Sequence, residues 1–308
     1  MKKIFIHGSS GTTGLRIRQR LSGRSYIELI ILPEGKRHDP DDIRLAMNQS
    51  DITFLCLPDD AAMEAVSLCD NPRTVIIDAS TAHRTLPGWV YGFPELGEGQ
   101  AEAIKNSRRI AVPGCHASGF VALVAPLVSA GMLRADTALT CFSLTGYSGG
   151  GKGMITQYEG AERSALLGAP RQYGLKQHHK HLPEMVKICG LTVTPVFCPV
   201  VADFYSGMEV TVPLFAAQLK GSMEDVRSLY RTLYTGPVVK YTSGDDGDGF
   251  LSAAALSGRD TMQISVLGNE ERLLLTSRFD NLGKGASGAA VQCMNLVLGL
   301  DPTTGLAL

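Results

Sequence analysis

The stretch KIFIHGSSGTTG, residues 3–14, decides the fold of the first part of the chain. A short apolar run ends at His7, and glycines follow at positions 8, 11 and 14. This spacing lets the backbone turn tightly and approach a pyrophosphate, which would lie at the positive end of the following helix. We therefore predict a strand, a turn and a helix that bind a dinucleotide; the alternative is a plain turn.

The candidate cofactor contacts in this loop are glycines and hydroxyl side chains, namely Gly8, Ser10, Gly11, Thr12, Thr13 and Gly14. After an expected second strand, Glu34 stands where an acidic residue would bind a free ribose hydroxyl. Lys36 and Arg37 follow at once, and two cations suit a 2′-phosphate. We therefore favour NADP over NAD as the cofactor, with a solvated basic turn as the alternative.

The rest of the first third alternates apolar runs with helical patterns. Strands are expected at residues 27–32, 52–57, 74–77 and 109–112, and helices at residues 14–22, 44–49 and 61–69. Continuous apolar strands separated by helices predict a parallel sheet covered on both faces, as in a Rossmann-like domain. Loops at the carboxyl ends of its strands face the cofactor, which adds Pro58 and Ser80 as candidate contacts.

The pattern changes after Cys115. A long apolar helix is expected at residues 117–130, followed by longer β-like runs at 138–144, 193–201, 208–213, 263–267 and 273–277. Their wider spacing predicts a mixed or antiparallel sheet, so we place a domain boundary between residues 114 and 115. Residues 242–249 are expected to form an exposed loop, and residues 288–298 a final helix.

Composition narrows the class of protein. The formal net charge is −1, so no basic field draws the chain to nucleic acid or to an anionic membrane. The seven cysteines form no C-x-x-C pair, which favours a reducing compartment over a disulfide framework or a zinc site. No apolar stretch has the length of a membrane span or signal peptide. We therefore expect a cytoplasmic protein.

Cys115 stands out among the seven cysteines as the candidate nucleophile. It follows an expected strand and the turn Pro113-Gly114, and it precedes the long helix. A thiol at the start of a helix feels the positive end of the helix dipole, which favours the thiolate.

Three of the seven histidines lie together in residues 178–184, HHKHLPE. We interpret this segment as the source of an acid or base and of ligand contacts, with Glu184 at the start of a helix; a metal site and a solvated turn are the alternatives. His181 is our first choice for proton transfer, His179 the second and His116 the third.

Two further places suit an anionic substrate. Residues 145–152, TGYSGGGK, follow a strand, and their glycines could present backbone N–H groups to a phosphate or carboxylate. This makes Ser148, Gly149 and Lys152 candidate substrate contacts, and Arg84 is another. The alternative at each place is a flexible loop.

Taken together, these motifs resemble the N-acetyl-gamma-glutamyl-phosphate reductases of arginine biosynthesis, in their shorter form. The resemblance rests on residues 8–14, 78–84, 91–96, 113–115, 146–152, 179–184 and 281–290, and so spans nearly the whole chain. Many relatives carry tyrosine after the cysteine, where this chain has His116.

The resemblance implies an NADP-binding domain of residues 1–114, to which residues 284–308 return. It also implies an α+β catalytic and oligomerisation domain of the glyceraldehyde-3-phosphate dehydrogenase type, residues 115–283, in a dimer or tetramer. Asn281, Gly283 and Lys284 would then lie near the nicotinamide.

The resemblance further implies reduction of an acyl phosphate through a thioester on Cys115, with no metal. Aspartate-semialdehyde dehydrogenase and N-acetyl-aminoadipyl-phosphate reductase stay open as alternatives. A redox sensor that binds NADP without turnover is the alternative from another class.

Overall fold

The computed structural model describes residues 1–308, which divide into two compact units. The first unit contains Met1–Pro94, Gly99–Gly114 and Ala286–Gly305. The second contains Glu95–Glu98, Cys115–Gly285 and Leu306–Leu308. None of the helices combines the length and the apolar character that crossing a membrane requires.

A six-stranded parallel sheet forms the centre of the first unit, in the order β2-β1-β3-β4-β6-β5. Its strands are β1 (Lys2–His7), β2 (Ile27–Ile30), β3 (Ile52–Leu55), β4 (Val75–Asp78), β5 (Val90–Tyr91) and β6 (Arg109–Ala111). Every residue of β3 and β4 is buried, as expected for central strands covered on both faces. The predicted Rossmann-like sheet is confirmed.

The helices of this unit are α1 (Thr12–Leu21), α2 (Pro40–Gln49), α3 (Asp59–Ser67), α4 (Gln100–Asn106) and α9 (Gly288–Val297). Helix α2 begins four residues earlier than predicted, because Asp39 caps it by accepting the backbone N–H groups of Asp41 and Asp42. Strand β5 and helix α4 were not predicted. Both are short, and α4 follows Gly99, which offers no side-chain cap.

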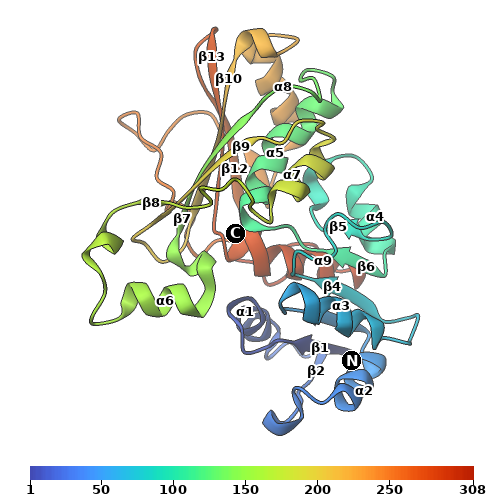
Figure 1. The fold of residues 1–308 in the computed structure, drawn as a ribbon. Helices are drawn as coiled ribbons and strands as arrows, with labels where there is room; N and C mark the ends of the chain where they lie inside the picture. Colours follow the sequence, from blue (N-terminus) through green and yellow to red (C-terminus); the bar gives the residue numbers. More distant parts are fainter. The chain divides into compact units, whose positions relative to one another are not determined.

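A seven-stranded mixed sheet forms the centre of the second unit, in the order β11-β12-β13-β10-β7-β9-β8. Its strands are β7 (Thr140–Gly146), β8 (Arg171–Gln172), β9 (Val196–Ala202), β10 (Met208–Phe215), β11 (Val239–Tyr241), β12 (Met262–Gly268) and β13 (Arg272–Phe279). Pairs β7–β9 and β11–β12 are parallel and the others are antiparallel. The predicted mixed sheet is confirmed, and its long strands are seen side by side in Figure 1.

The second unit has the helices α5 (Cys115–Ser129), α6 (Gly151–Glu159), α7 (Leu182–Cys189) and α8 (Met223–Leu233). Helix α5 packs on β10 and β13 and against α7. Gly119 permits this close approach, because a Cβ there would lie 2.5 Å from Cγ2 of Val210. Helix α8 was not predicted from the sequence, although Ser222 and Asp225 form a capping box at its start.

Candidate functional site

The glycine loop before α1 has two positions, Gly8 and Gly14, at which no side chain could be accommodated. Gly8 has φ +86°, and a Cβ there would lie 2.3 Å from the carbonyl oxygen of Cys56. A Cβ on Gly14 would lie 2.3 Å from the carbonyl oxygen of Gly8. Gly11 caps the helix, whose first turn, with Thr12 and Thr13, holds no acidic residue. The loop therefore leaves the positive end of α1 open to an anion.

A cavity of about 560 Å³ adjoins this loop within the first unit. Its walls are apolar at residues such as Ile30 and Leu57 and carry charges of both signs, at Arg18 and Arg37 and at Glu34 and Glu64. The loop residues Gly8, Ser9 and Ser10 and the helix cap Pro58 also line it. A cavity with apolar sides, a few cations and an open helix start fits a dinucleotide.

The two predicted phosphate-binding cations are placed differently. Arg37 lines the cavity, whereas Lys36 does not and forms an ion pair of 2.9 Å with Asp42. The hydrogen bond to Asp42 raises the pKa of Lys36, and the negative charge of Asp42 raises it further. The structure therefore brings one of the two cations to the cavity.

His7 also lines the cavity and was not predicted as a contact. Burial, and then the nearby His38, lowers its pKa to about 4, so the ring is neutral at neutral pH. Its Nδ1 atom is buried and has no hydrogen-bond partner in the protein. A ligand atom could satisfy it, which further fits a cofactor in this cavity.

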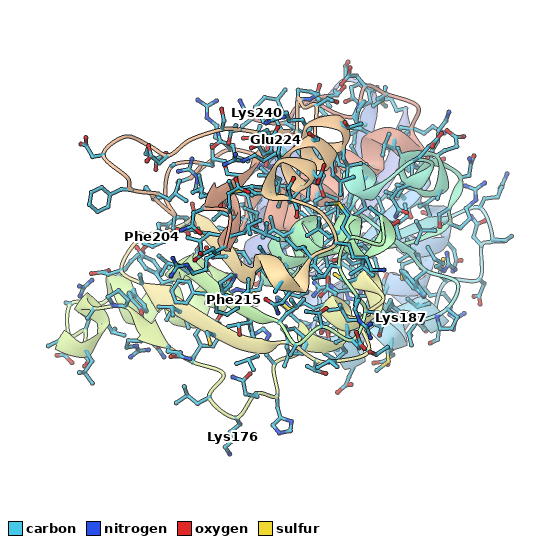
Figure 2. The ribbon with its side chains drawn as sticks, turned by 90° about the horizontal axis from the view of Figure 1, so that it is seen from above. Lys176, Lys187, Phe204, Phe215, Glu224 and Lys240 are labelled. Atoms are coloured by element: carbon cyan, nitrogen blue, oxygen red, sulfur yellow. The ribbon has the colours of Figure 1, made fainter.

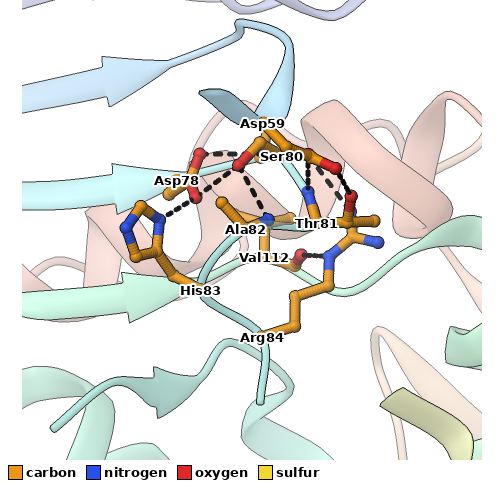
Figure 3. A network of polar contacts seen from close by, with 9 residues as sticks. Asp59, Asp78, Ser80, Thr81, Ala82, His83, Arg84 and Val112 are labelled. Atoms are coloured by element: carbon orange, nitrogen blue, oxygen red, sulfur yellow. Dashed lines mark hydrogen bonds and ion pairs between the residues drawn. The ribbon is translucent and has the colours of Figure 1, made fainter. Parts of the chain in front are cut away.

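A polar network shapes the chain after β4 (Figure 3). The Ser80 hydroxyl donates to a carboxylate oxygen of Asp78 at 2.6 Å, and Nδ1 of His83 lies 2.6 Å from the same oxygen. The His83 ring stacks on Trp89 with centroids 4.0 Å apart. This network fixes the turn that carries Ser80, the predicted cofactor contact.

Arg84, a predicted substrate contact, belongs to the same turn. Its Nε donates to the carbonyl oxygen of Val112 at 2.8 Å, and one terminal nitrogen donates to that of Ala79 at 3.1 Å (Figure 3). These bonds join the segments that follow β4 and β6 and hold the buried guanidinium in place.

Cys115 is the first residue of α5 and is half-buried. The positive end of this helix stabilises a thiolate. Gly285 leaves room beside it, since a Cβ there would lie 3.1 Å from Cβ of Cys115. By contrast, burial raises the pKa of the Cys56 thiol to about 12 and raises those of Cys141 and Cys189 as well, so these thiols stay protonated.

Three histidines gather at the start of α5 and α7. The rings of His179 and His181 have centroids 4.8 Å apart, and each lies 5.6 Å from the ring of His116. The backbone N–H of His181 donates to Nδ1 of His179 at 3.2 Å. The structure thus brings all three predicted proton-transfer candidates together, and one of them, His116, directly follows Cys115 in the chain.

The segment between β8 and α7 carries two of these histidines. Its Lys176 points away from the protein (Figure 2), whereas Tyr173 and His179 return toward His116. Burial lowers the pKa of His179, and Lys180 adds to this effect. His181 caps α7, and Glu184 is buried in the first turn of that helix.

His116 is fully buried between two hydroxyl groups that were not predicted as site residues. Its Nδ1 lies 2.7 Å from Oγ of Ser143, and its Nε2 lies 2.6 Å from the Tyr173 hydroxyl. Burial, helped by His179, lowers the pKa of His116 to about 3. The sequence offers no distinct signal for Ser143, because the same strand also carries the polar residues Thr140 and Thr145.

The predicted anion loop is instead helical. Residues Tyr147–Gly150 form a 3₁₀ turn and α6 begins at Gly151, so the glycines continue into a helix. Ser148 is buried and accepts a hydrogen bond of 3.0 Å from the Asn281 side chain, close to Gly149. Lys152 is exposed on α6.

The remaining predicted cofactor contacts are tightly packed within the second unit. The Asn281 side chain also accepts the backbone N–H of Gly207 at 2.9 Å. A Cβ on Gly283 would lie 2.1 Å from the carbonyl oxygen of Arg259. Lys284 is buried and forms an ion pair of 2.6 Å with Glu95. No group of three or more potential metal ligands occurs in the structure.

Family models match both parts of the chain. The NAD binding domain of semialdehyde dehydrogenases matches residues 3–107, and their dimerisation domain matches residues 115–281. Curated relatives include N-acetyl-gamma-glutamyl-phosphate reductase 2 of Nostoc sp., 43% identical, with 99% of each chain covered. The enzyme of the same name from Pseudomonas putida is 44% identical, with 96% of each chain covered.

Solved structures agree on the fold. Aspartate semialdehyde dehydrogenase II of Vibrio cholerae has a TM-score of 0.72 at 16% identity, with 97% of this chain and 98% of that chain covered. The Candida albicans aspartate semialdehyde dehydrogenase, solved with NADP, has a TM-score of 0.68 at 16% identity, with 97% and 98% covered. The chain belongs to the semialdehyde dehydrogenase family and, within it, to the N-acetyl-gamma-glutamyl-phosphate reductases.

Proposed function

We propose that this chain reduces N-acetyl-gamma-glutamyl phosphate to N-acetylglutamate 5-semialdehyde and releases phosphate, as a step of arginine biosynthesis. The observation that carries the proposal is the half-buried thiol of Cys115 at the start of α5, followed by His116, whose ring packs with those of His179 and His181. The identity to named relatives over the whole chain supports this substrate above aspartyl phosphate or N-acetyl-aminoadipyl phosphate.

The first step is attack by the Cys115 thiolate on the acyl carbon. The bond from this carbon to the phosphate oxygen breaks, phosphate leaves, and a thioester forms. His181 takes the proton of the thiol, and the Cys115 backbone N–H at the helix start donates a hydrogen bond to the oxyanion. His179, whose Nδ1 accepts from the His181 backbone, helps to place that ring.

The second step resolves the thioester. The α1 start and the adjoining cavity would hold NADPH, which would supply the hydride to the thioester carbonyl carbon. The carbonyl then reforms as the bond to sulfur breaks, so that the aldehyde leaves and the Cys115 thiolate is regenerated. His181, protonated in the first step, donates a proton to the oxyanion that hydride addition forms, and takes it back as the carbonyl reforms.

We assign the cofactor to residues 1–114 with 284–308, and catalysis and oligomerisation to residues 115–283. The open start of α1 and the adjoining cavity support NADP contacts from Gly8, Ser10, Gly11, Thr12, Thr13, Gly14, Arg37 and Pro58. Ser80, Asn281, Gly283 and Lys284 remain proposed contacts, whereas Lys36, which pairs with Asp42 and does not line the cavity, is not retained as one. Arg84, Ser148, Gly149, Lys152 and Glu184 remain the proposed substrate contacts.

The assembly and location belong to the same proposal. The match to a dimerisation domain supports a homo-oligomer, and we propose a dimer or tetramer. The seven free cysteines suit the reducing cytoplasm, where biosynthesis of amino acids takes place.

The test is phosphate-dependent reduction of NADP in the reverse direction. We expect N-acetylglutamate semialdehyde to support it at a kcat/KM well above those of aspartate semialdehyde and N-acetyl-aminoadipate semialdehyde. Faster turnover of either competitor would reassign the substrate. NADP binding without turnover of any of the three would instead indicate a redox sensor.

A further inference from the structure

Three side chains form a continuous hydrogen-bonded chain that starts next to the nucleophile. His116 follows Cys115 in the first turn of α5. Its Nδ1 lies 2.7 Å from the Ser143 hydroxyl on β7, and its Nε2 lies 2.6 Å from the Tyr173 hydroxyl after β8. The mechanism above assigns no role to any of these three residues.

Burial fixes the number of protons on the imidazole. The low pKa of His116, about 3, leaves the ring neutral, so that it carries one N–H and one acceptor nitrogen. Two arrangements of hydrogens are then possible, depending on which ring nitrogen carries the proton.

The burial of Ser143 selects between these arrangements. Ser143 has no exposed surface, and an O–H group left without an acceptor at such a place is costly. We therefore infer that Ser143 donates to Nδ1 of His116. The ring hydrogen is then on Nε2 and is donated to the Tyr173 oxygen, so the hydrogen of the Tyr173 hydroxyl points away from the ring.

The hydroxyl hydrogen of Tyr173 is therefore available for donation to a group other than His116. The side chain is only half-buried, unlike that of Ser143, and its hydroxyl lies 2.6 Å from Nε2 of His116, the residue that follows Cys115 at the start of α5. Burial, and then the charge of Cys115, raises the pKa of Tyr173, which keeps the phenol protonated and a donor.

We propose that His116 and Ser143 are positioning residues that hold the Tyr173 hydroxyl as a hydrogen-bond donor to the Cys115 thiolate. His116 is then not a base, despite its place beside the thiol, because its acceptor nitrogen is occupied by Ser143. The inference rests on the proposed function only in taking Cys115 as the nucleophile.

The pH dependence of Cys115 alkylation by iodoacetamide tests the inference without any substrate. A hydrogen bond to a charged group contributes enough that its loss should raise the midpoint of thiolate formation by about one pH unit in His116→Leu. His116→Gln keeps an amide donor and acceptor and should stay close to the parent midpoint. Ser265→Ala removes another buried strand hydroxyl, bonded to Thr242, and is the matched control.

Turnover gives a second readout. We expect His116→Leu to lower kcat by roughly tenfold to a hundredfold, with the KM values nearly unchanged, since the hydrogen bond acts on the thiolate. Ser143→Ala should lower kcat less. Adding Ser143→Ala to His116→Leu should have no further effect, because both act through one hydrogen-bonded chain.

Several outcomes would overturn the inference. An unchanged alkylation midpoint in both His116→Leu and Ser143→Ala would show that Tyr173 does not act on the thiolate. An equal shift in Ser265→Ala would show a general loss of packing. If His116→Leu fails to fold, as judged by its melting curve, Ser143→Ala carries the test, and an unchanged midpoint in that variant then overturns the inference. Alkylation needs no acyl phosphate, so the result can be interpreted even if the chain does not turn over the proposed substrate.

Discussion

Helices α1 and α5 each start a few residues after a strand of the parallel sheet, and their starts are built in opposite ways. At the start of α1, Gly8 and Gly14 stand where any Cβ would collide with backbone. At the start of α5, side chains are placed with defined partners, with Cys115 first and His116 held between two hydroxyl groups. The first start leaves space for a bound anion, and the second presents a nucleophile.

The same local architecture therefore supports two different tasks. Exposed backbone N–H groups and the helix dipole are present at both starts, so the difference lies in the side chains alone. It follows that changes at the α1 start should weaken cofactor binding and spare thiol reactivity. Changes at the α5 start should do the reverse.

The largest effect is expected from Cys115→Ser. Removal of a nucleophile in other enzymes costs a very large factor, so we expect kcat to fall by roughly 10⁴-fold or more. NADPH affinity, measured by fluorescence titration, should stay within about twofold, because Cys115 does not line the cofactor cavity. Cys69→Ser, at another half-buried thiol, should leave kcat unchanged. A Cys115→Ser protein that keeps its turnover would disprove the thioester mechanism.

The next effect concerns the two histidines before α7. Loss of a proton-transfer group costs about a hundredfold to ten-thousandfold, which we expect for kcat of His181→Asn. His179→Asn should cost less, because its contact to the His181 backbone N–H orients the neighbour. Of the two variants, only His181→Asn should remove one limb of the pH profile of kcat/KM. The reverse order of the two variants would exchange their roles.

Both sheets and most of their strands could be predicted because periodicity is a local signal, whereas the order of the strands could not. The apolar runs of β3 and β4 and the spacing of residues 8–14 are readable without any knowledge of distant contacts. The same holds for Cys115, whose place between a turn and a helix is encoded in adjacent residues. Helix α6 was missed because its glycine-rich start has the composition of a loop.

The partners of the site could not be predicted in the same way. Ser143 and Tyr173 lie 27 and 57 residues from His116 in the chain, and their contacts arise only when β7 and β8 join one sheet. The sequence also could not show which of Lys36 and Arg37 lines the cavity. In the structure Lys36 forms an ion pair with Asp42, six residues later, and only Arg37 lines the cavity.

The third prediction compares two glycines with nearly the same positive φ, Gly8 at +86° and Gly23 at +84°. Alanine at Gly23 meets no neighbouring atom, so the cost in unfolding free energy is the left-handed strain, about 1–2 kcal/mol. Alanine at Gly8 must also move the backbone of Cys56. We therefore expect only Gly8→Ala to raise the Kd of NADPH, by about tenfold or more. Equal Kd values in both variants would mean that the α1 start does not bind the cofactor.

The smallest effect separates the two cations after β2. Arg37 lines the cavity, so Arg37→Gln should remove a charge-assisted contact to the 2′-phosphate and raise the Kd of NADP by roughly tenfold to a hundredfold. The Kd of NAD, which lacks that phosphate, should stay within about twofold.

Lys36→Gln is the matched control, since this side chain is exposed and paired with Asp42. Exposed pairs contribute little, so neither cofactor should lose more than about threefold in affinity. Calorimetric titration of the four protein and cofactor pairs decides between the cations. Equal weakening of NAD and NADP by Arg37→Gln would assign Arg37 to the structure of the cavity wall. A larger loss in Lys36→Gln would mean that the pair with Asp42 opens when NADP binds, and that the phosphate is held by the lysine.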